Sequence, residues 1–377
     1  MSGDDRIMVI GSGLGGLTAA VALQRRGKDV VLFEQFDKLL EVGAGITLNS
    51  NAITALREIG LDKTAEERGS VLEKFAHRSS GGKLITTWDT GSIGRNLHAP
   101  IVGISRPEIQ RSLAESLGDA ELRFGHKLVG LEQDGSGVTA RFENGAEERG
   151  AVLIGADGGN STVRPLFDAT PRRYSGYTTW LALSNVENFA PGTHTQWYGN
   201  GSIVGSHAVG GGKSYWYASK TAPEGERDPD TKKECLDIFG DWHEPVPEMI
   251  RATDNIPRSD IYDLPRRDRW GEGRVTLLGD AAHPMAPALG QGACQAIEDG
   301  VILASYLDTD GDVDAALRAY EAKRIERTAP IAKRAGLQGK LMQGDNPAIR
   351  FARYASFKFA PEGQVLKSFQ KLLTFEG

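Results

Sequence analysis

The chain has 377 residues, of which 40% are hydrophobic, and its 44 basic and 50 acidic residues give a net charge of −6. This length has room for about two or three domains, and the acidic balance excludes nucleic acid as an expected partner. Only two cysteines occur, Cys235 and Cys294, which excludes a disulfide framework and a cysteine-rich metal site. Because no apolar run reaches the roughly 18–20 residues of a membrane span and no signal peptide is visible, we expect a cytoplasmic protein with no integral membrane segment and no metal.

A strand–helix–strand unit is predicted at the start of the chain. An apolar run at 7–10 meets a glycine-rich turn, a helical pattern follows at 17–23, and a second apolar run lies at 30–33. Strand, glycine turn, helix and strand within about 30 residues form the smallest structure that binds half of a dinucleotide.

The residues of the turn fit that interpretation one by one. Gly11 permits the tight turn, Gly13 lets the backbone approach a pyrophosphate, and Gly16 lets helix and strand pack closely. Glu34 follows the second strand, where a carboxylate can accept hydrogen bonds from ribose hydroxyls. We assign its neighbour Gln35 to the same cofactor site. The motif alone does not separate FAD from NAD.

Further elements of an α/β domain follow. In chain order they are a small-residue loop at 43–48, a helix at 51–61, an extended segment ending at Arg106, a helix at 108–117, strands at 127–132 and 137–142 joined by an Asp134-Gly135 hairpin, and a buried strand at 151–155. The last strand delivers Asp157, two glycines and Arg164 to the edge of the sheet where α/β proteins bind ligands.

A second domain is predicted at 173–265, where the strands are rich in aromatic residues. The buried-strand pattern returns at 273–280, so this antiparallel sheet interrupts the first domain. The predicted division is therefore a cofactor domain at 1–172 and 266–345, the inserted domain, and a tail at 346–377. Four clustered aromatic residues of the insert suit a sheet core and a substrate surface equally well: Trp197, Tyr198, Trp216 and Tyr217.

The segment after Asp280 decides the interpretation. A carboxylate at a strand end can hold a polyol hydroxyl, and a Pro/Gly loop that opens a helix can face an anionic ring edge. A ribityl chain and a reduced flavin fit both demands. Three pieces thus resemble the single-component (class A) FAD-dependent aromatic monooxygenases, such as the salicylate-, hydroxybenzoate- and hydroxynicotinate-type hydroxylases: Gly11-x-Gly13-x-x-Gly16 with Glu34, Gly155-Ala156-Asp157-Gly158 with Ser161 and Arg164, and Gly279-Asp280-Ala281-Ala282-His283-Pro284.

The resemblance implies a fold and a chemistry. The fold is α/β, with a Rossmann-like, glutathione-reductase-type FAD-binding domain and an inserted antiparallel β-sheet substrate domain. FAD would be bound non-covalently and reduced by NADH or NADPH as a transient reductant. A flavin C(4a)-hydroperoxide would then insert one oxygen atom of O2 into a small aromatic or heteroaromatic substrate. Only one GxGxxG motif is present, so the nicotinamide donor would bind transiently and would have no dinucleotide-binding domain of its own.

The same resemblance assigns cofactor contacts. Thr47 and Arg106 match positions that touch the flavin or its ribityl-phosphate arm, Leu128 matches a backbone contact to adenine, and Asp280 matches the ribityl contact. Asp157 matches an acid that links the two domains and influences nicotinamide use, and it suits a structural role as well. The loop under the isoalloxazine is assigned to Pro287, Gly290, Gly292 and Ala293.

The catalytic groups cannot be carried over. The hydroxynicotinate-type relatives have histidine where this chain has Thr47, and many relatives have arginine where Leu181 follows Trp180. We therefore consider three substitutes, listed with their alternatives: His207 as a base or as a histidine on the solvent face of the sheet, Gln291 as a group that orients substrate or as a polar helix start, and Tyr217. Three other polar residues are expected elsewhere: His283 in a hydrogen bond of the flavin loop, and Arg324 and Arg327 on a solvated helix face.

Alternatives remain for function and assembly. One is a flavin epoxidase or oxidative tailoring enzyme of a natural product, and another is a flavin-binding scaffold that has lost its base. The aromatic residues of the tail suit a dimer contact or a cover over the active-site mouth, and its basic residues give weak support to peripheral membrane contact. We expect a monomer or homodimer and lean towards a neutral or phenolic substrate.

Overall fold

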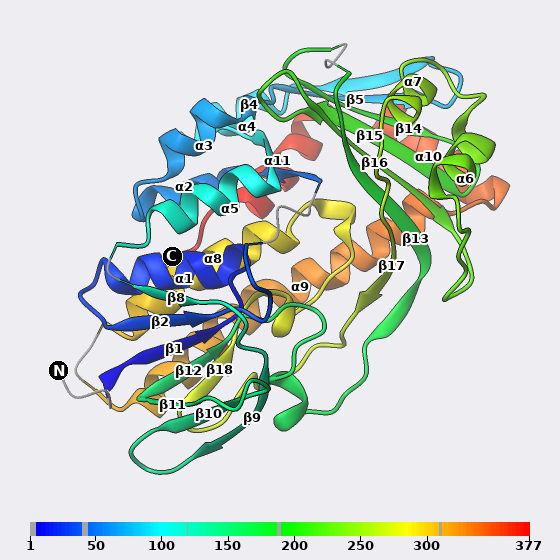
Figure 1. Cartoon of the computed structure of the whole chain (residues 1–377). Helices are drawn as coiled ribbons and strands as arrows, with labels where there is room; N and C mark the ends of the chain where they lie inside the picture. Colours follow the sequence, from blue (N-terminus) through cyan, green and yellow to red (C-terminus); the bar gives the residue numbers. More distant parts are fainter. Residues whose placement is uncertain (1–4, 40–43, 119, 187–189, 309–310) are drawn as a thin grey trace.

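The computed structural model describes residues 5–39, 44–118, 120–186, 190–308 and 311–377 (Figure 1). Gly43, the first residue of the expected small-residue loop, lies outside these ranges.

The cofactor domain is built on a five-stranded parallel sheet. Its strand order is β18-β12-β1-β2-β8, with β1 (Ile7–Ile10), β2 (Val30–Phe33), β8 (Glu121–Arg123), β12 (Val152–Gly155) and β18 (Val275–Leu277). The helices α1 (Leu14–Gln24) and α8 (Gly292–Tyr306) lie together on one face of this sheet (Figure 1). They pack closely because Gly300 has no side chain: a Cβ there would lie 2.7 Å from the backbone nitrogen of Ala19. The predicted strand–helix–strand unit is confirmed.

A small antiparallel sheet lies against the same core. It contains β9 (Leu128–Gln133), β10 (Val138–Phe142) and β11 (Glu147–Gly150), and its buried residues Val138, Ala140 and Phe142 join the core of the parallel sheet. The predicted hairpin at Asp134 is confirmed, since the Asp134 carboxylate accepts hydrogen bonds from the backbone nitrogens of Ser136 and Gly137.

The second large sheet has seven strands in the order β17-β13-β16-β15-β14-β5-β6. Its members are β5 (Lys74–Ser79), β6 (Leu84–Trp88), β13 (Arg173–Ser184), β14 (Thr193–Tyr198), β15 (Ser202–Ala208), β16 (Ser214–Thr221) and β17 (Arg258–Asp263). All neighbours are antiparallel except β14 and β5, which are parallel. Two of its strands, β5 and β6, lie outside the 173–265 range expected for the inserted domain.

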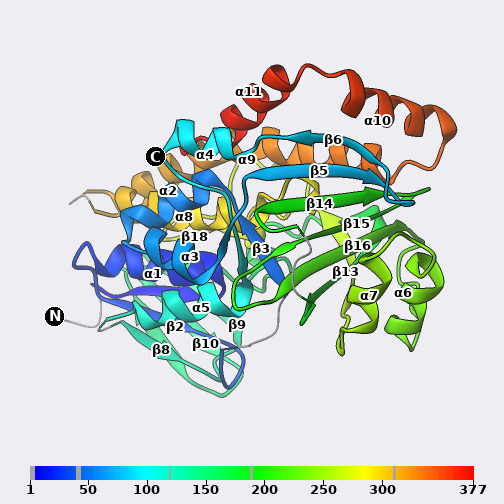
Figure 2. The ribbon, with the colours of Figure 1, turned by 90° about the horizontal axis from the view of Figure 1, so that it is seen from above.

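Strand alternation separates the clustered aromatic residues between the two faces of this sheet. Trp197 and Trp216 are fully buried with Trp180 against the helices α6 (Thr231–Phe239) and α7 (Val246–Arg251) (Figure 2). Tyr198 and Tyr217 belong to the opposite face, where they join a different apolar cluster. The tryptophans are therefore sheet core, and only the tyrosines face the side that carries His207.

A third, three-stranded sheet connects the two large ones. It consists of β3 (Gly45–Leu48), β7 (Val102–Ser105) and β4 (Ser70–Val71). The expected loop at 43–48 is thus wrong for residues 45–48, because Ile46 and Leu48 pair with β7 and pack into the core. Around this sheet lie α2 (Ser50–Glu58), α3 (Asp62–Arg68), α4 (Gly91–Leu97) and α5 (Arg106–Glu115).

The chain ends in three helices: α9 (Val313–Gln343), α10 (Pro347–Phe359) and α11 (Glu362–Leu373). The long α9 runs from the cofactor domain to the seven-stranded sheet, and α10 lies on the outer side of the molecule beyond β6 (Figure 2). Within the described ranges, no helix is long and apolar enough to cross a membrane. Nor do His, Cys, Asp and Glu gather there in a group of three or more that could hold a metal ion.

Candidate cofactor and substrate site

The glycine turn after β1 has the sterics that a dinucleotide requires. Gly11 has a φ of +103°, and a Cβ there would lie 2.6 Å from the carbonyl oxygen of Ala156. A Cβ on Gly16 would lie 2.0 Å from the carbonyl oxygen of Gly11, so helix and turn touch directly. By contrast, a Cβ on Gly13 would meet nothing within 4 Å. The open side of the turn is therefore at Gly13, at the start of α1, where backbone N–H groups favour an anion.

Glu34 holds this turn from the end of β2. Its Oε2 atom accepts hydrogen bonds from the backbone nitrogen (3.0 Å) and hydroxyl (2.6 Å) of Ser12, while Oε1 accepts one from the nitrogen of Phe36 (3.1 Å). The next residue, Gln35, is exposed. The predicted carboxylate is thus beside the turn, although its visible partners are protein groups.

A second loop packs against the turn from β12. The Oδ2 atom of Asp157 accepts hydrogen bonds from the backbone nitrogen (2.6 Å) and hydroxyl (2.9 Å) of Thr162, which gives Asp157 a structural role in its own loop. Arg164 is buried and donates to the carbonyl oxygen of Ala281 at 3.0 Å. This bond ties the second motif of the sequence to the third. Leu128, predicted to contact adenine through its backbone, begins β9 and is buried.

Asp280 lies where the third motif meets α8. Its side chain is exposed, yet neighbouring protein raises the pKa of the carboxyl by desolvation, against the effect of His283 and Arg106. A Cβ on Gly292, the first residue of α8, would lie 3.7 Å from Oδ1 of Asp280. The loop between them, residues 281–291, is called the flavin loop below, after the cofactor that the resemblance implies. It contains a 3₁₀ turn at Pro287–Leu289 and Gly290 with a φ of +60°, and Ala293 follows in the first turn of α8.

Beneath this loop lies a buried network of charged residues. Arg324 is fully buried and donates to Oδ1 of Asp299 (2.5 Å) and to Oε2 of Glu298 (2.8 Å). The Nε2 atom of His283 lies 2.6 Å from Oδ2, the other carboxylate oxygen of Asp299. This is a hydrogen bond of the kind that the sequence led us to expect for His283. Burial alone would raise the pKa of Asp299, but His283 and Arg324 outweigh it and lower the pKa to about 2. The expectation that Arg324 lies on a solvated helix face is wrong.

Arg327 departs from the same expectation. Its side chain is 10% exposed, and it donates to the carbonyl oxygens of Leu372 and Thr374, both at 2.8 Å. It therefore joins α9 to the end of α11 and is not solvated.

The predicted substrate-orienting residue Gln291 belongs to the buried network. It is fully buried, and its Oε1 accepts hydrogen bonds from Asn51 (3.1 Å) and Gln295 (2.9 Å). Asn51 in turn donates to Glu298 at 2.6 Å. These contacts give Gln291 a role in holding the flavin loop on α2, and a direct role towards substrate stays a prediction.

His207 lies at the contact between the seven-stranded sheet and the cofactor side. Its Nε2 atom is 3.0 Å from the hydroxyl of Thr47, and its Nδ1 atom is 2.9 Å from the carbonyl oxygen of Ala208. Because a carbonyl can only accept, Nδ1 carries the proton, and Nε2 accepts the proton of Thr47. Burial lowers the pKa of His207 to about 4, so the ring is neutral near pH 7. His207 is fully buried, which rules out the alternative of a solvent-facing histidine.

Glycines in the connecting sheet make this approach possible. A Cβ on Gly103 would lie 2.4 Å from Nδ1 of His207, and a Cβ on Gly45 would lie 2.4 Å from Cβ of Tyr215. The seven-stranded sheet therefore rests directly on β3 and β7. Asn49, which directly follows β3, donates from its side chain to the carbonyl oxygen of Gly290 at 3.1 Å.

Tyr217 lies on the same face as His207 and pairs with a residue that the sequence did not single out. Its hydroxyl is 3.0 Å from Nε2 of His194, and the His194 ring stacks on Phe75 with 4.4 Å between ring centroids. His194 lies 5.0 Å from the ring of His207, also centroid to centroid. In the sequence, the only indication of His194 was its spacing of four residues from Tyr198, which places both side chains on the same face of a strand. Phe75 was missed because β5 was not expected in this sheet.

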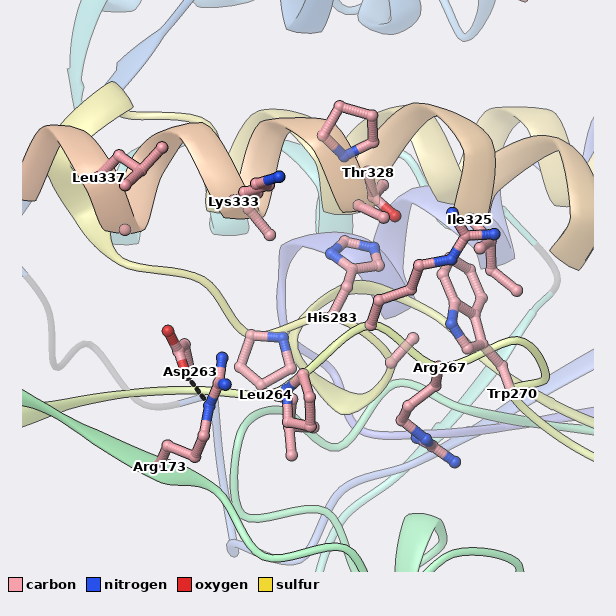
Figure 3. A pocket seen from close by; sticks show the side chains of 18 of the residues that line it. Arg173, Asp263, Leu264, Arg267, Trp270, His283, Ile325, Thr328, Lys333 and Leu337 are labelled. Carbon is pink, nitrogen blue, oxygen red and sulfur yellow. Dashed lines mark hydrogen bonds and ion pairs between the residues drawn. The ribbon is translucent and has the colours of Figure 1, made fainter.

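A pocket of about 680 Å³ lies on the other side of the flavin loop, between residues 263–267 and α9 (Figure 3). His283 forms part of its wall below α9, and Trp270 and Thr328 flank it. Arg173 and Asp263 form an ion pair at its lower edge. The pocket contains neither the glycine turn nor the His207 face.

The comparisons with known proteins agree with this geometry. A family described as FAD binding domain matches residues 4–335. The chain is 38% identical to the aurachin C monooxygenase/isomerase of Stigmatella aurantiaca, covering 90% of both chains. It is 37% identical to the chloroplastic zeaxanthin epoxidase of Oryza sativa subsp. japonica, covering 86% of this chain and 54% of that longer one.

A solved structure gives the same result for the fold and the cofactor. The Klebsiella pneumoniae HpxO complexed with FAD and uric acid superposes with a TM-score of 0.92 at 29% identity, covering 98% of this chain and 96% of that one. We predict that FAD would be held by the open turn at Gly13, the carboxylates at Glu34 and Asp280 and the loop at Gly290. This protein belongs to the FAD-binding family of flavoprotein monooxygenases that includes the class A aromatic hydroxylases.

Proposed function

We propose that this protein consumes NADH or NADPH and transfers one oxygen atom from O2 to a small, neutral aromatic or heteroaromatic substrate. The substrate would lie against the face of the seven-stranded sheet that carries Tyr217 and His194. The observation that carries this proposal is the Thr47–His207 hydrogen bond, because it joins a predicted flavin contact to that face of the sheet.

In this geometry Thr47 and His207 have different roles: Thr47 can contact a ligand, and His207 positions Thr47. Since Thr47 gives its proton to Nε2 of His207, the lone pairs of its oxygen stay available to accept a hydrogen bond. An N–H or O–H group of the cofactor or substrate could be held there. His207 itself has both ring nitrogens engaged, so it acts as a positioning residue through Thr47.

The electrostatics of the face favour an uncharged substrate. Burial lowers the pKa of His194 and of His207, and it raises the pKa of Tyr215 and of Tyr217. All four side chains are therefore neutral near pH 7, and a carboxylate substrate would find no compensating charge on them. The half-buried tyrosines can share a hydrogen bond with a ring hydroxyl or ring N–H.

FAD would supply the redox chemistry, accepting hydride from the nicotinamide and activating O2. The protein's contribution is to hold it. The N-terminus of α8 would face the pyrimidine edge of the ring and favour negative charge there. Packing of β3 and β7 onto the sheet excludes water around His207, which favours productive oxygen transfer.

Anaerobic stopped-flow reduction of the holoenzyme by NADH and by NADPH tests the proposal. The flavin absorbance is followed with and without phenols, hydroxybenzoates, hydroxypyridines, quinolones, indoles and uric acid. We expect one neutral aromatic to accelerate reduction by orders of magnitude, and isotopically labelled O2 to deliver one labelled atom to its product. A protein that retains FAD but responds to no ligand of the panel would contradict the proposal and favour the scaffold alternative.

An epoxidase is the second candidate, and the similarity to zeaxanthin epoxidase favours it. Both reactions add one oxygen atom, so the mass of the product does not separate them. The position of the oxygen does: hydroxylation leaves a phenolic arene, whereas epoxidation consumes a carbon–carbon double bond. The same labelled product, analysed by NMR, distinguishes the two.

A further inference from the structure

The outer surface of α10 is apolar, although this helix lies at the edge of the molecule. Only two of its residues, Arg353 and Phe357, are buried. On the opposite side of the helix, five residues with the spacing of one helical face form a stripe, which we call the α10 stripe: Ala348, Phe351, Ala352, Ala355 and Phe359. The two phenylalanines are 73% and 72% exposed, the highest values among the exposed large hydrophobic residues of the described chain.

The helix is fixed in this orientation by its buried side. The guanidinium of Arg353 donates to the carbonyl oxygens of Met342 (2.5 Å) and Gly199 (3.0 Å). The Phe357 ring stacks on His77 with 4.4 Å between centroids. Rotation of α10 to hide the stripe would break these contacts, so the outward position of the phenylalanines follows from the packing.

Exposed basic residues accompany the stripe. Arg350 and Lys358 are exposed on α10, and the helix contains no acidic residue, in a chain whose net charge is −6. The Lys358 ammonium lies 5.8 Å from the ring centroid of Tyr354 and 5.5 Å from that of Phe359. An apolar stripe bordered by basic residues and aromatic rings has the composition of a helix that lies in the plane of a membrane interface.

We propose that α10 is a membrane-binding element that places Phe351 and Phe359 among the acyl chains of an anionic bilayer while Arg350 and Lys358 contact its phosphate groups. A second copy of this chain is a poorer occupant. Two α10 helices packed stripe to stripe would bring their basic residues together with no carboxylate on either helix, whereas anionic lipid neutralises them.

A pocket beside α10 connects the proposed membrane contact with the proposed substrate face. It has a volume of about 490 Å³ and is lined by Phe351, Tyr354 and Phe357 of α10 and by Tyr198 at the end of β14. Tyr198 and Phe357 belong to an apolar cluster against which Tyr217 packs. A lipophilic aromatic substrate that leaves the bilayer at α10 would thus meet the apolar cluster next to the proposed substrate face.

Co-sedimentation of the FAD-loaded protein with vesicles tests the proposal. Vesicles of phosphatidylcholine alone are compared with vesicles that also contain phosphatidylglycerol, at low and high salt. We expect binding to the anionic vesicles that weakens with salt. The double variant Phe351→Ser/Phe359→Ser should lower the partition coefficient at least about tenfold, and Arg350→Glu/Lys358→Glu should lower it comparably.

A matched control separates the stripe from general surface hydrophobicity. Leu337 on α9 is 62% exposed, and Leu337→Ser should bind vesicles like the original protein. Failure to bind anionic vesicles overturns the proposal. So does self-association, measured by light scattering, that the Phe351→Ser/Phe359→Ser variant abolishes, because α10 would then contact a second copy. None of these measurements requires NADH, NADPH or turnover, so their outcome is separable from that of the proposed function.

Discussion

The hydroxyl of Thr47 and the Nε2 atom of His207 are 3.0 Å apart, although the two residues are 160 positions apart in the chain. If this bond positions Thr47, its loss should be visible in turnover. We expect Thr47→Val to lower the kcat of substrate-stimulated NAD(P)H oxidation at least about tenfold, while Thr47→Ser, which keeps the hydroxyl, retains most of it. Steady-state kinetics of the two variants decides this, and equal activity of both would remove the hydroxyl from the mechanism.

Two substitutions in the glycine turn should separate an effect on FAD binding from an effect on stability. Gly13→Ala should leave the thermal stability of the apoprotein unchanged, because nothing lies within 4 Å of the new methyl group, but it should weaken FAD binding. Gly16→Ala should lower Tm as well, because its methyl group would lie 2.0 Å from the carbonyl oxygen of Gly11. Differential scanning fluorimetry and flavin-fluorescence titration separate the two effects. An unchanged FAD affinity in Gly13→Ala would contradict the assignment of the turn.

The buried network under the flavin loop should be sensitive to loss of Arg324, which contacts both of its carboxylates. Arg324→Met removes the guanidinium that binds both Glu298 and Asp299 and leaves these buried carboxylates only their weaker partners, which we expect to cost about 3–5 kcal/mol in the free energy of unfolding. Urea denaturation of the variant measures this. Arg334→Met is the control, since Arg334 lies exposed on the same helix. A loss of similar size in both variants would show that the network is not responsible.

Three histidines of the seven-stranded sheet, two of them buried and His194 half-buried, should make the protein sensitive to mild acid. Burial lowers the pKa of His207 to about 4 and that of His77 to about 3, from 6.5, and it also lowers that of His194. The unfolded chain therefore binds more protons below pH 6.5, and stability falls as the pH is lowered from about 6.5 to 4.

Thermal denaturation at several pH values checks this dependence. His77→Phe should reduce the fall in Tm between pH 6.5 and pH 4 by roughly 5 °C. His243→Phe, at an exposed position, should leave that fall unchanged. A Tm that is constant across that pH range would show that these histidines are not held neutral by the fold.

The success of sequence reasoning differs between the two halves of the site, for physical reasons. The glycine turn could be predicted because Gly11 and Gly16 each meet a steric demand that only a missing side chain satisfies. Arg324 was misplaced because its spacing on α9 does not tell which face meets Asp299, a residue on a different helix. Likewise, the strand pattern of β14 carries no information that its partner is β5, so Phe75 was not expected beside His194.

The pairing of β14 with β5 also constrains how the protein can be made. The first residues of the large sheet leave the ribosome long before their partners at Thr193–Tyr198, and the parallel sheet must wait for β18 at Val275–Leu277. Neither the seven-stranded sheet nor the parallel sheet is complete during most of synthesis. The apolar strands of both sheets are therefore exposed to aggregation until the chain is nearly complete. Separate expression of either predicted domain should therefore yield insoluble protein, and chaperone supply during translation should govern the yield of the whole chain.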